Sequence, residues 1–389
     1  MTNVKVQGRL PLIALFLFAS LTLPLQAQQI HQLVYNNVNW SDSNLGGTLG
    51  NEFGGIVAFV TTPNNQEHIY YGGSDGHIHQ RYFANIGGFP IWVDEDLTAE
   101  TGGASDYFYA QLAGFAIQNF QYVFYYGNDT HIHQLLYNNV KWANQDLTSL
   151  AGGPSASSGG SMVAFTTTPN NQIHVYYRAD PDGDLHQLFF NGQRWSDENL
   201  TKETGGQGNF GLTAAGFSNG NYQYIFYLGF DVHIHELYYN NIRWNDVDLT
   251  IRSGSPLPDL SSGVAALLIP GTQTMQVYYS SRSIGDVIQL ASSDNYSWSK
   301  GNLTYLTNGP GTSGQPGLTA FTTPGNGVHV YYVAQLSQTD NHINQLFFNG
   351  STWSNEDLTA ETNGGLAQWG NQISGFAVGN LQYVVYEAQ

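Results

Sequence analysis

The sequence predicts an all-β fold, a seven-bladed β-propeller of four-stranded antiparallel blades, and three observations support this prediction. A segment of about 50 residues recurs along the chain. Each copy contains four short strand-like runs. The two ends of the chain carry complementary halves of one copy. Repeats of this length with four strands each are typical of propeller blades.

The repeat is anchored by tryptophans, each followed four residues later by Asp or Asn and then by Leu. Successive tryptophans are 49 to 55 residues apart. Their regularity favours a packing role between blades, although a tryptophan at the rim can also stack on a sugar ring. The seven are Trp40, Trp92, Trp142, Trp195, Trp244, Trp298 and Trp353.

Four strands are expected within one period, at residues 114–117, 121–126, 131–137 and 142–148. These runs are rich in β-branched and aromatic residues and are separated by Asn, Gly and Asp. The sequence Thr-Thr-Pro-Asn-Asn-Gln at 61–66 and again at 167–172 is expected to form the first hairpin turn of its blades. No window has a sustained helical period.

The two ends of the mature chain predict how the ring closes. Residues 29–45 carry third- and fourth-strand sequence, whereas residues 373–386 carry first- and second-strand sequence. We therefore expect one propeller domain over residues 28–389, in which the N-terminal and C-terminal strands pair within one blade. Such pairing removes the free edges of an open array.

Residues 1–27 have the pattern of a signal peptide. Lys5 and Arg9 precede an apolar run at 10–25, and the small residue Ala27 follows. The run is short for a membrane anchor, so we expect cleavage near Ala27 and a secreted protein, extracellular or periplasmic. The chain has no cysteine, which excludes disulfides and thiol chemistry.

The charge balance excludes whole classes of partner. The net charge of −18 becomes −20 once the segment carrying Lys5 and Arg9 is removed. Nucleic acids and anionic membranes need clustered Lys and Arg, so neither is expected as a partner, and no membrane insertion is expected. The abundance of Gly, Asn, Gln, Ser, Thr and Tyr suits hydroxyl-rich ligands.

The repeat resembles the fucose-specific lectin family of β-propellers. The resemblance rests on His-Ile-Tyr-Tyr at 68–71, on Asp-Gly-His-Ile-His-Gln at 75–80 and on the tryptophan that follows. It implies sugar sites in clefts between neighbouring blades. An Arg of the second strand and a Glu of the third would hold the hydroxyls, and an aromatic residue of the adjacent blade would cover the ring. The family typically has six blades.

No blade of this chain keeps that Arg–Glu pair. The Arg place is assigned to His68, His174, Gln276 and His329, and in the other blades to Val123, Ile225 and Val384. The Glu place holds Gln32, Gln80, Gln134, Gln187, Gln289 and Gln345, and Glu236 alone is acidic. We expect neutral hydrogen bonding instead. The candidate ligand-binding residues are His68, Gln80, His174, Gln187, Glu236, His329, Gln345 and Trp369, the last in a Gly-rich loop.

Two patterns leave a metal site as an alternative. Histidines two apart, such as His131 and His133, could bind zinc. Because they recur from blade to blade, we expect them instead to hydrogen-bond the Asp or Asn after the tryptophan. The segment Asp-Pro-Asp-Gly-Asp at 180–184 could bind calcium, but a solvated turn is expected. No metal and no cofactor are therefore predicted.

No catalytic residues are predicted. Carboxylates recur around the fourth strand, whereas a catalytic pair would be a singular feature. They are Asp94, Glu95, Glu198, Glu203, Glu356 and Glu361. The sequence predicts a secreted carbohydrate-binding protein, not an enzyme, with several inter-blade sites for glycans or polysaccharide. The alternatives are a protein-binding scaffold and a polysaccharide-cleaving enzyme.

Overall fold

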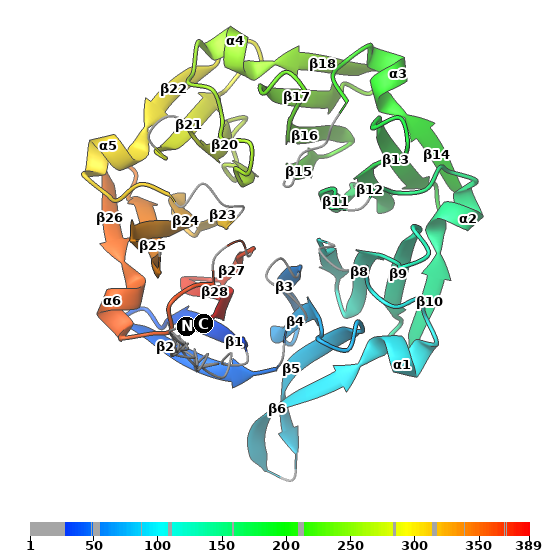
Figure 1. Cartoon of the computed structure of the whole chain (residues 1–389), viewed down its shortest axis with the longest axis horizontal. Helices are drawn as coiled ribbons and strands as arrows, with labels where there is room; N and C mark the ends of the chain where they lie inside the picture. Colours follow the sequence, from blue (N-terminus) through cyan, green and yellow to red (C-terminus); the bar gives the residue numbers. More distant parts are fainter. Residues whose placement is uncertain are drawn as a thin grey trace, which may run out of the picture.

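The computed structural model describes residues 28–389 apart from 48, 50–54, 87, 108–110, 158, 209–213, 283–284, 313–316, 338, 369 and 371. The expected signal segment and Trp369 lie outside the described residues. Within the described part of the chain, 28 strands form seven four-stranded antiparallel sheets around a central axis (Figure 1). This arrangement confirms the seven-bladed propeller.

We number the blades along the chain, starting with the first complete one. Blade 1 consists of β3 (Ile56–Thr61), β4 (Gln66–Gly72), β5 (Ile78–Ile86) and β6 (Phe89–Asp96). Blade 2 consists of β7 (Ala113–Ile117), β8 (Phe120–Tyr126), β9 (Ile132–Tyr137) and β10 (Trp142–Asp146). Blade 3 consists of β11 (Met162–Thr167), β12 (Gln172–Arg178), β13 (Leu185–Phe190) and β14 (Trp195–Asn199). Blade 4 consists of β15 (Ala214–Asn219), β16 (Tyr222–Leu228), β17 (Ile234–Tyr239) and β18 (Trp244–Asp248). Blade 5 consists of β19 (Val264–Leu268), β20 (Met275–Ser280), β21 (Val287–Ser292) and β22 (Ser299–Asn302). Blade 6 consists of β23 (Leu318–Thr323), β24 (Gly327–Ser337), β25 (Asp340–Phe348) and β26 (Trp353–Asp357).

Blade 7 joins the two ends of the chain. Its strand order is β2 (Trp40–Gly46), β1 (Gln29–Tyr35), β28 (Leu381–Ala388) and β27 (Ser374–Val378). Leu33 of β1 lies opposite Val384 of β28, and both side chains are fully buried. The N-terminal and C-terminal strands therefore close the ring side by side, as predicted (Figure 1).

The fourth strand is shorter than expected, because its last residue caps a one-turn helix that follows directly. In blade 2 the strand ends at Asp146, not at 148, and α2 follows. A helix of five residues is too short to give a sustained helical period in the sequence. The six such helices in the described residues are α1 (Leu97–Thr101), α2 (Leu147–Ala151), α3 (Leu200–Thr204), α4 (Leu249–Ser253), α5 (Leu303–Thr307) and α6 (Leu358–Thr362).

Each residue of the recurring Asp-Leu-Thr motif has a structural role. Asp96 Oδ1 accepts from the N–H of Ala99 and caps α1. Leu97 is fully buried. Thr98 Oγ1 accepts from the N–H of Ile78 at 2.9 Å and ties the helix to the third strand. The motif therefore closes the outer edge of the blade.

The repeat tryptophans pack between blades, as their regularity suggested. Trp142 of blade 2 meets Tyr70 of blade 1 edge-on, with ring centroids 6.1 Å apart. Trp244 and Trp40 contact Tyr176 and Tyr331 in the same geometry. Trp298 and Trp353 meet Phe226 and Tyr278 in the same way, so these tryptophans form an aromatic contact at five of the interfaces between blades.

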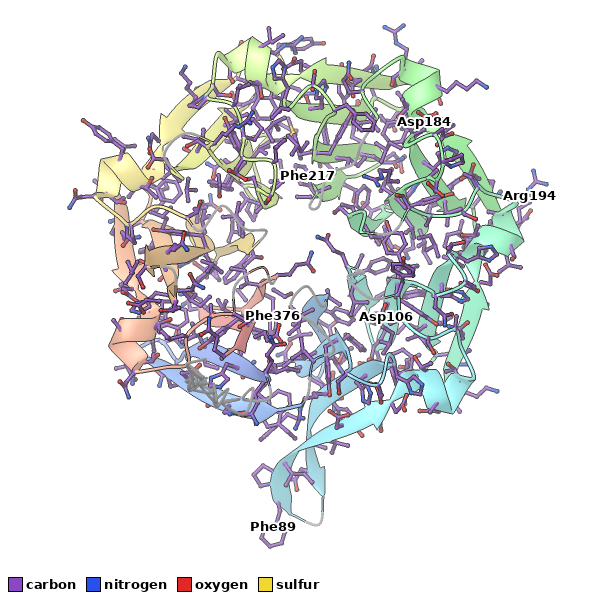
Figure 2. The ribbon with its side chains drawn as sticks, in the orientation of Figure 1. Phe89, Asp106, Asp184, Arg194, Phe217 and Phe376 are labelled. Atoms are coloured by element: carbon purple, nitrogen blue, oxygen red, sulfur yellow. The ribbon has the colours of Figure 1, made fainter. Side chains whose placement is uncertain are left out.

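One hairpin departs from the ring. Strand β6 is longer than the other fourth strands, and the hairpin of β5 and β6 extends outward beyond the neighbouring blades (Figure 1). Phe89 lies at the tip of this hairpin and is 73% exposed (Figure 2). At the centre, the innermost strands surround a cavity of about 310 Å³. Among the described residues, no helix is long and apolar enough to cross a membrane.

Candidate functional site

Strand pairing corrects the assignment of equivalent positions. Gln80 of β5 lies opposite Tyr70 of β4, and His68 lies two residues before Tyr70 on the same face. In blade 2, Gln134 lies opposite Phe124, so the counterpart of His68 is Tyr122. The same pairing replaces Ile225 with Tyr224 and Val384 with Tyr383. The expected Val123, Ile225 and Val384 are wrong by one residue, and a one-residue step reverses the face.

His68 and Gln80 form the floor of a cleft between blades 1 and 2. Gln80 Nε2 donates to His68 Nδ1 at 2.6 Å. The other imidazole nitrogen of His68 therefore carries the proton and donates to Thr61 Oγ1 at 3.3 Å. Both ring nitrogens are satisfied inside the protein, and the side chains of His68 and Gln80 are 2% exposed. His68 thus positions Gln80.

The same network occurs at two further interfaces. In blade 3, His174 accepts from Gln187 at 2.5 Å and contacts Thr167; in blade 6, His329 accepts from Gln345 at 2.6 Å and contacts Thr323. Burial lowers the pKa of His68 to about 4, of His174 to about 3 and of His329 to about 4. All three imidazoles are therefore neutral at physiological pH.

The neighbouring blade completes each floor with a glutamine. Gln121 Oε1 accepts from the hydroxyl of Tyr70 and, at 3.0 Å, from Gln80 Nε2. Gln223 accepts from Tyr176, and Gln382 accepts from Tyr331, across the other two interfaces. These buried polar groups are bonded from one blade to the next, as such groups must be in a low-dielectric interior. Sequence reasoning did not single out these glutamines.

The cleft between blades 1 and 2 has a volume of about 340 Å³. Blade 1 contributes Tyr82, Glu95 and Glu100 to its walls, and the hydroxyl of Tyr82 donates to Glu95 at 2.9 Å. Blade 2 contributes Val140, Lys141 and Trp142. A cleft of this size, with one aromatic wall and several polar groups, suits a small polar ligand.

From blade to blade, the residues of the cleft walls change together with those of the floor. We call the interfaces between blades 1 and 2, 3 and 4, and 6 and 7 the histidine clefts. Only blades 1, 3 and 6 carry a Glu opposite the third-strand Gln together with a Glu in the following helix; these pairs are Glu95 and Glu100, Glu198 and Glu203, and Glu356 and Glu361. Only blades 2, 4 and 7 present an exposed aliphatic residue two positions before the tryptophan, namely Val140, Ile242 and Val38.

This concerted variation distinguishes a built site from packing. In blades 2, 4, 5 and 7 the residues opposite the third-strand Gln or Glu are Gln145, Val247, Gly301 and Ser43. Packing between blades needs the tryptophan everywhere, but it does not need the acids. The sequence contained this signal, since the acids occur only in blades that also carry the histidine.

The acidic candidate Glu236 lies in a different environment. Its side chain is fully buried between blades 4 and 5, and the amide of Asn295 lies 2.6 Å from Oε1. Burial raises the pKa of Glu236 to about 8, so its carboxyl is largely protonated at neutral pH. In blade 7, Gln32 donates to Glu67 of blade 1. These floors are closed by contacts between blades.

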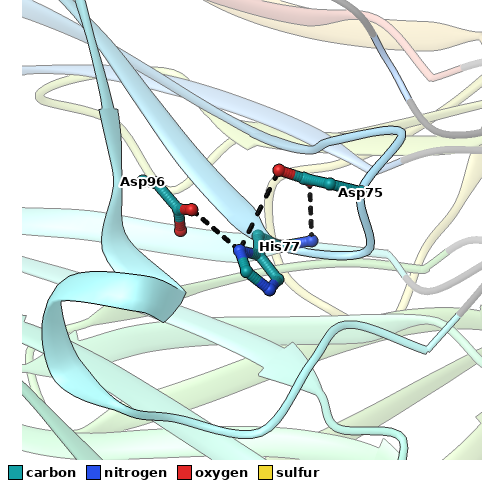
Figure 3. A group of neighbouring side chains, drawn as sticks. All are labelled: Asp75, His77 and Asp96. Carbon is teal, nitrogen blue, oxygen red and sulfur yellow. Dashed lines mark hydrogen bonds and ion pairs between the residues drawn. The ribbon is translucent and has the colours of Figure 1, made fainter.

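The histidine pairs lie at the rim and bond to carboxylates. His77 Nδ1 lies 2.8 Å from Asp96 Oδ2 and 3.9 Å from Asp75 Oδ2 (Figure 3). The second histidine, His79, contacts Asp94 at 2.9 Å and Asp75 at 3.1 Å. The expected bond to the Asp after the tryptophan is confirmed for the first histidine of each pair. The second histidine of each pair bonds instead to the Asp or Asn that lies two residues before this Asp, as His79 does to Asp94.

We call the hydrogen bond between the residue before the third strand and the residue that caps the helix the rim contact. In every case described below, it joins a donor side chain to a carboxylate, although the two residue types change between blades. Where a His directly precedes the Ile near the start of the third strand, the residue that caps the helix is Asp, as in His131 and Asp146. Blade 3 instead has Asp184, and Asn199 Nδ2 donates to it at 2.7 Å. Asp182 Oδ1 accepts from the N–H of Asp184, which is a turn contact within the 180–184 segment. Four groups of Asp and His at this rim lie close enough to hold a metal ion, and their members hydrogen-bond within the protein.

Comparison with known proteins identifies the fold. No family model and no curated protein matches the sequence. Among solved structures, the six-bladed fucose-binding lectin of Aleuria aurantia matches with a TM-score of 0.54 at 17% identity, over 78% of this chain and 94% of that chain. The chain has the fold of fucose-binding lectins.

Two further solved structures agree. A variant of AofleA from Arthrobotrys oligospora matches with a TM-score of 0.55 at 12% identity and covers 92% of this chain and 93% of its own. The SapL1 lectin, solved with α-methyl fucoside, matches with a TM-score of 0.51 at 14% identity, over 79% of this chain and 96% of that chain. At these identities the likeness concerns the fold.

Proposed function

We propose that the chain is an exported carbohydrate-binding protein whose sugar sites are the three histidine clefts. The observation that supports this most is that the floor histidine, the two glutamates and the exposed aliphatic residue before the tryptophan occur together, at the same three of the seven interfaces. Each cleft offers an aromatic wall for the apolar face of a sugar ring and amide and carboxylate groups for its hydroxyls. The resemblance to lectins favours binding over catalysis, and the signal-like start supports export.

Several weak sites on one ring act together on a multivalent glycan. A sugar bound in one cleft raises the effective concentration of its neighbours on the same polymer, so avidity exceeds the affinity of one site. A scaffold protein would need no such repeated set of acids and amides. A polysaccharide-cleaving enzyme would need one singular catalytic pair, whereas three equivalent pairs are present here.

The test is glycan-array binding by the mature protein and by the triple variant His68→Ala, His174→Ala, His329→Ala. The matched control is Tyr122→Phe, Tyr224→Phe, Tyr383→Phe, which alters the equivalent positions of blades 2, 4 and 7. We expect array binding that free sugar competes, a loss of avidity in the histidine variant and none in the control. If both variants are folded and bind alike, the histidine clefts are not the sites. Release of sugar from a polysaccharide would instead indicate an enzyme.

A further inference from the structure

The acids of the histidine clefts have no cationic partner. Among the described residues, none of the six glutamates has a Lys, Arg or His nitrogen within 4.0 Å. The neighbouring Asp94, by contrast, is paired with His79 and Arg81. Six of the ten glutamates in the chain occupy these positions. Each of the three clefts therefore holds two glutamates that no cationic side chain of the described residues pairs with.

The rest of each cleft does not neutralise this charge. The histidine of the floor is neutral, so the fixed charges come from the two glutamates and from the residue that precedes the tryptophan. That residue is Lys141 in the first cleft, Arg243 in the second and Asn39 in the third. Two acids against one base leave −1 in the first two clefts, and two acids alone leave −2 in the third. All three clefts are therefore acidic.

A second observation points to a ligand donor. Gln187 Oε1 is buried and has no hydrogen-bond partner among the described residues, although Gln187 Nε2 is bonded to His174. The equivalent Gln80 lines its cleft. A buried acceptor without a donor is unfavourable, so a ligand that donates here gains free energy on binding.

We propose that the histidine clefts prefer a hexosamine with a free, cationic amino group over neutral and acidic sugars. This inference rests on the proposed function and specifies its ligand class. An ammonium group has three donors and no acceptor, which matches the two carboxylates of each cleft and, in the second cleft, the free amide oxygen of Gln187 as well. N-acetylation removes the positive charge, and a uronic acid is repelled by the glutamates.

A divalent metal ion is a less suitable occupant. The groups of three or more carboxylate and imidazole ligands that lie close together in the described residues are all at the rim, and none includes a cleft glutamate. Two carboxylates without a third close ligand fit an ammonium better than Ca²⁺, which takes six to eight oxygen ligands.

The test is calorimetric binding at low ionic strength with the tetramer of glucosamine and the tetramer of N-acetylglucosamine. We expect the free amine to bind about five- to tenfold more tightly, and the difference to shrink as salt is added. The variant Glu95→Gln, Glu198→Gln, Glu356→Gln should lose this preference, so that its affinities for the two tetramers become about equal. Glutamine keeps the acceptor that the hydroxyl of Tyr82 uses.

The control variant is Asp182→Asn, Asp259→Asn, Asp294→Asn. It removes the same number of charges outside the histidine clefts and keeps the acceptors of the turns that these residues cap. It should retain the preference. Equal binding of both tetramers by the native protein would overturn the inference and leave the proposed function standing. Spermidine binding as tightly as the amino sugar would also overturn it, because charge alone would then suffice. Binding of neither tetramer, with other sugars bound on the array, would reject the amino sugar.

Discussion

Gln80 lies directly opposite Glu95 in the pairing of β5 with β6, and the same relationship joins Gln187 with Glu198 and Gln345 with Glu356. Residues opposite each other on neighbouring strands point to one face of the sheet. The neutral floor and the acidic wall of a cleft are therefore set by a single register. Any slip of one residue would separate them.

A double-mutant cycle should show that the hydrogen bond between Tyr70 and Gln121 stabilises the folded protein. Tyr70→Phe should cost about 1 kcal/mol in the free energy of unfolding, and Gln121→Leu should cost more because it strands the buried hydroxyl of Tyr70. The double variant should cost less than the sum, since both partners are then apolar. Blade 2 already has Phe124 at the place of Tyr70. Urea unfolding measures all three, and strict additivity would show that the two side chains do not interact.

Acid should destabilise the protein through the three floor histidines. Their pKa lies near 6.5 in the unfolded chain and at about 4, 3 and 4 in the folded one. The unfolded state therefore binds more protons, and stability falls as the pH drops from about 6.5 through about 4. The variant His68→Asn, His174→Asn, His329→Asn should give a flatter acid limb.

The floor histidines should act on stability and not on sugar binding. Because both nitrogens are already bonded and stay neutral at pH 5, the floor histidines themselves should add no pH dependence to binding by the folded protein between pH 7 and pH 5. Unfolding at a series of pH values, run beside binding, separates the two effects. A native acid limb as flat as that of the variant would contradict the assignment.

Glu236 should act in the opposite direction. Its folded pKa is about 8, above the unfolded value near 4.5, so the stability it contributes below pH 4.5 is lost as the pH rises through about 8. Glu236→Gln should therefore be more stable than the native protein by an amount that grows over this range and reaches a few kcal/mol. Six other blades carry Gln at this position. Melting temperatures at pH 5 and pH 9 test this, and an equal shift at both would argue against a buried proton.

The rim contact should tolerate an exchange that preserves its polarity. Asp96→Asn alone keeps the helix cap but weakens the bond to His77, and His77→Asp alone places two acids together. The double variant reproduces the Asp–Asn pair of blade 3 and should recover most of the loss, about 1 kcal/mol. Thermal unfolding of the three variants checks this. A double variant less stable than either single one would contradict the reciprocal role of the two residues.

Almost the whole fold could be predicted from the sequence, because the tryptophan spacing recurs in each blade and the split repeat marks the two ends of the chain. It missed the one-turn helices, since a five-residue helix has no periodicity to detect and depends on its Asp cap. It also misplaced the counterparts of His68 by one residue. Blades 2, 4 and 7 have tyrosines beside aliphatic residues, so only strand pairing decides which of them faces the next blade.

The candidate site was only half visible from the sequence. His68, Gln80 and their equivalents could be named because a family pattern pointed to those positions. The glutamates could be predicted only as a recurring feature of the fourth strand, although they occur only in the three blades that carry a floor histidine. The cross-blade glutamines became visible only when Tyr70 was seen to bond to Gln121 from another sheet.

The number of sugars bound per chain tests the central claim most directly. Native mass spectrometry of the mature protein, titrated with a monovalent sugar found on the array, counts bound ligands without relying on avidity. Three equivalent sites per chain are expected, reduced to two by Glu198→Gln with His174→Ala in the second histidine cleft. Saturation at six or seven sugars, or at three that this double variant leaves intact, would contradict the assignment of the histidine clefts.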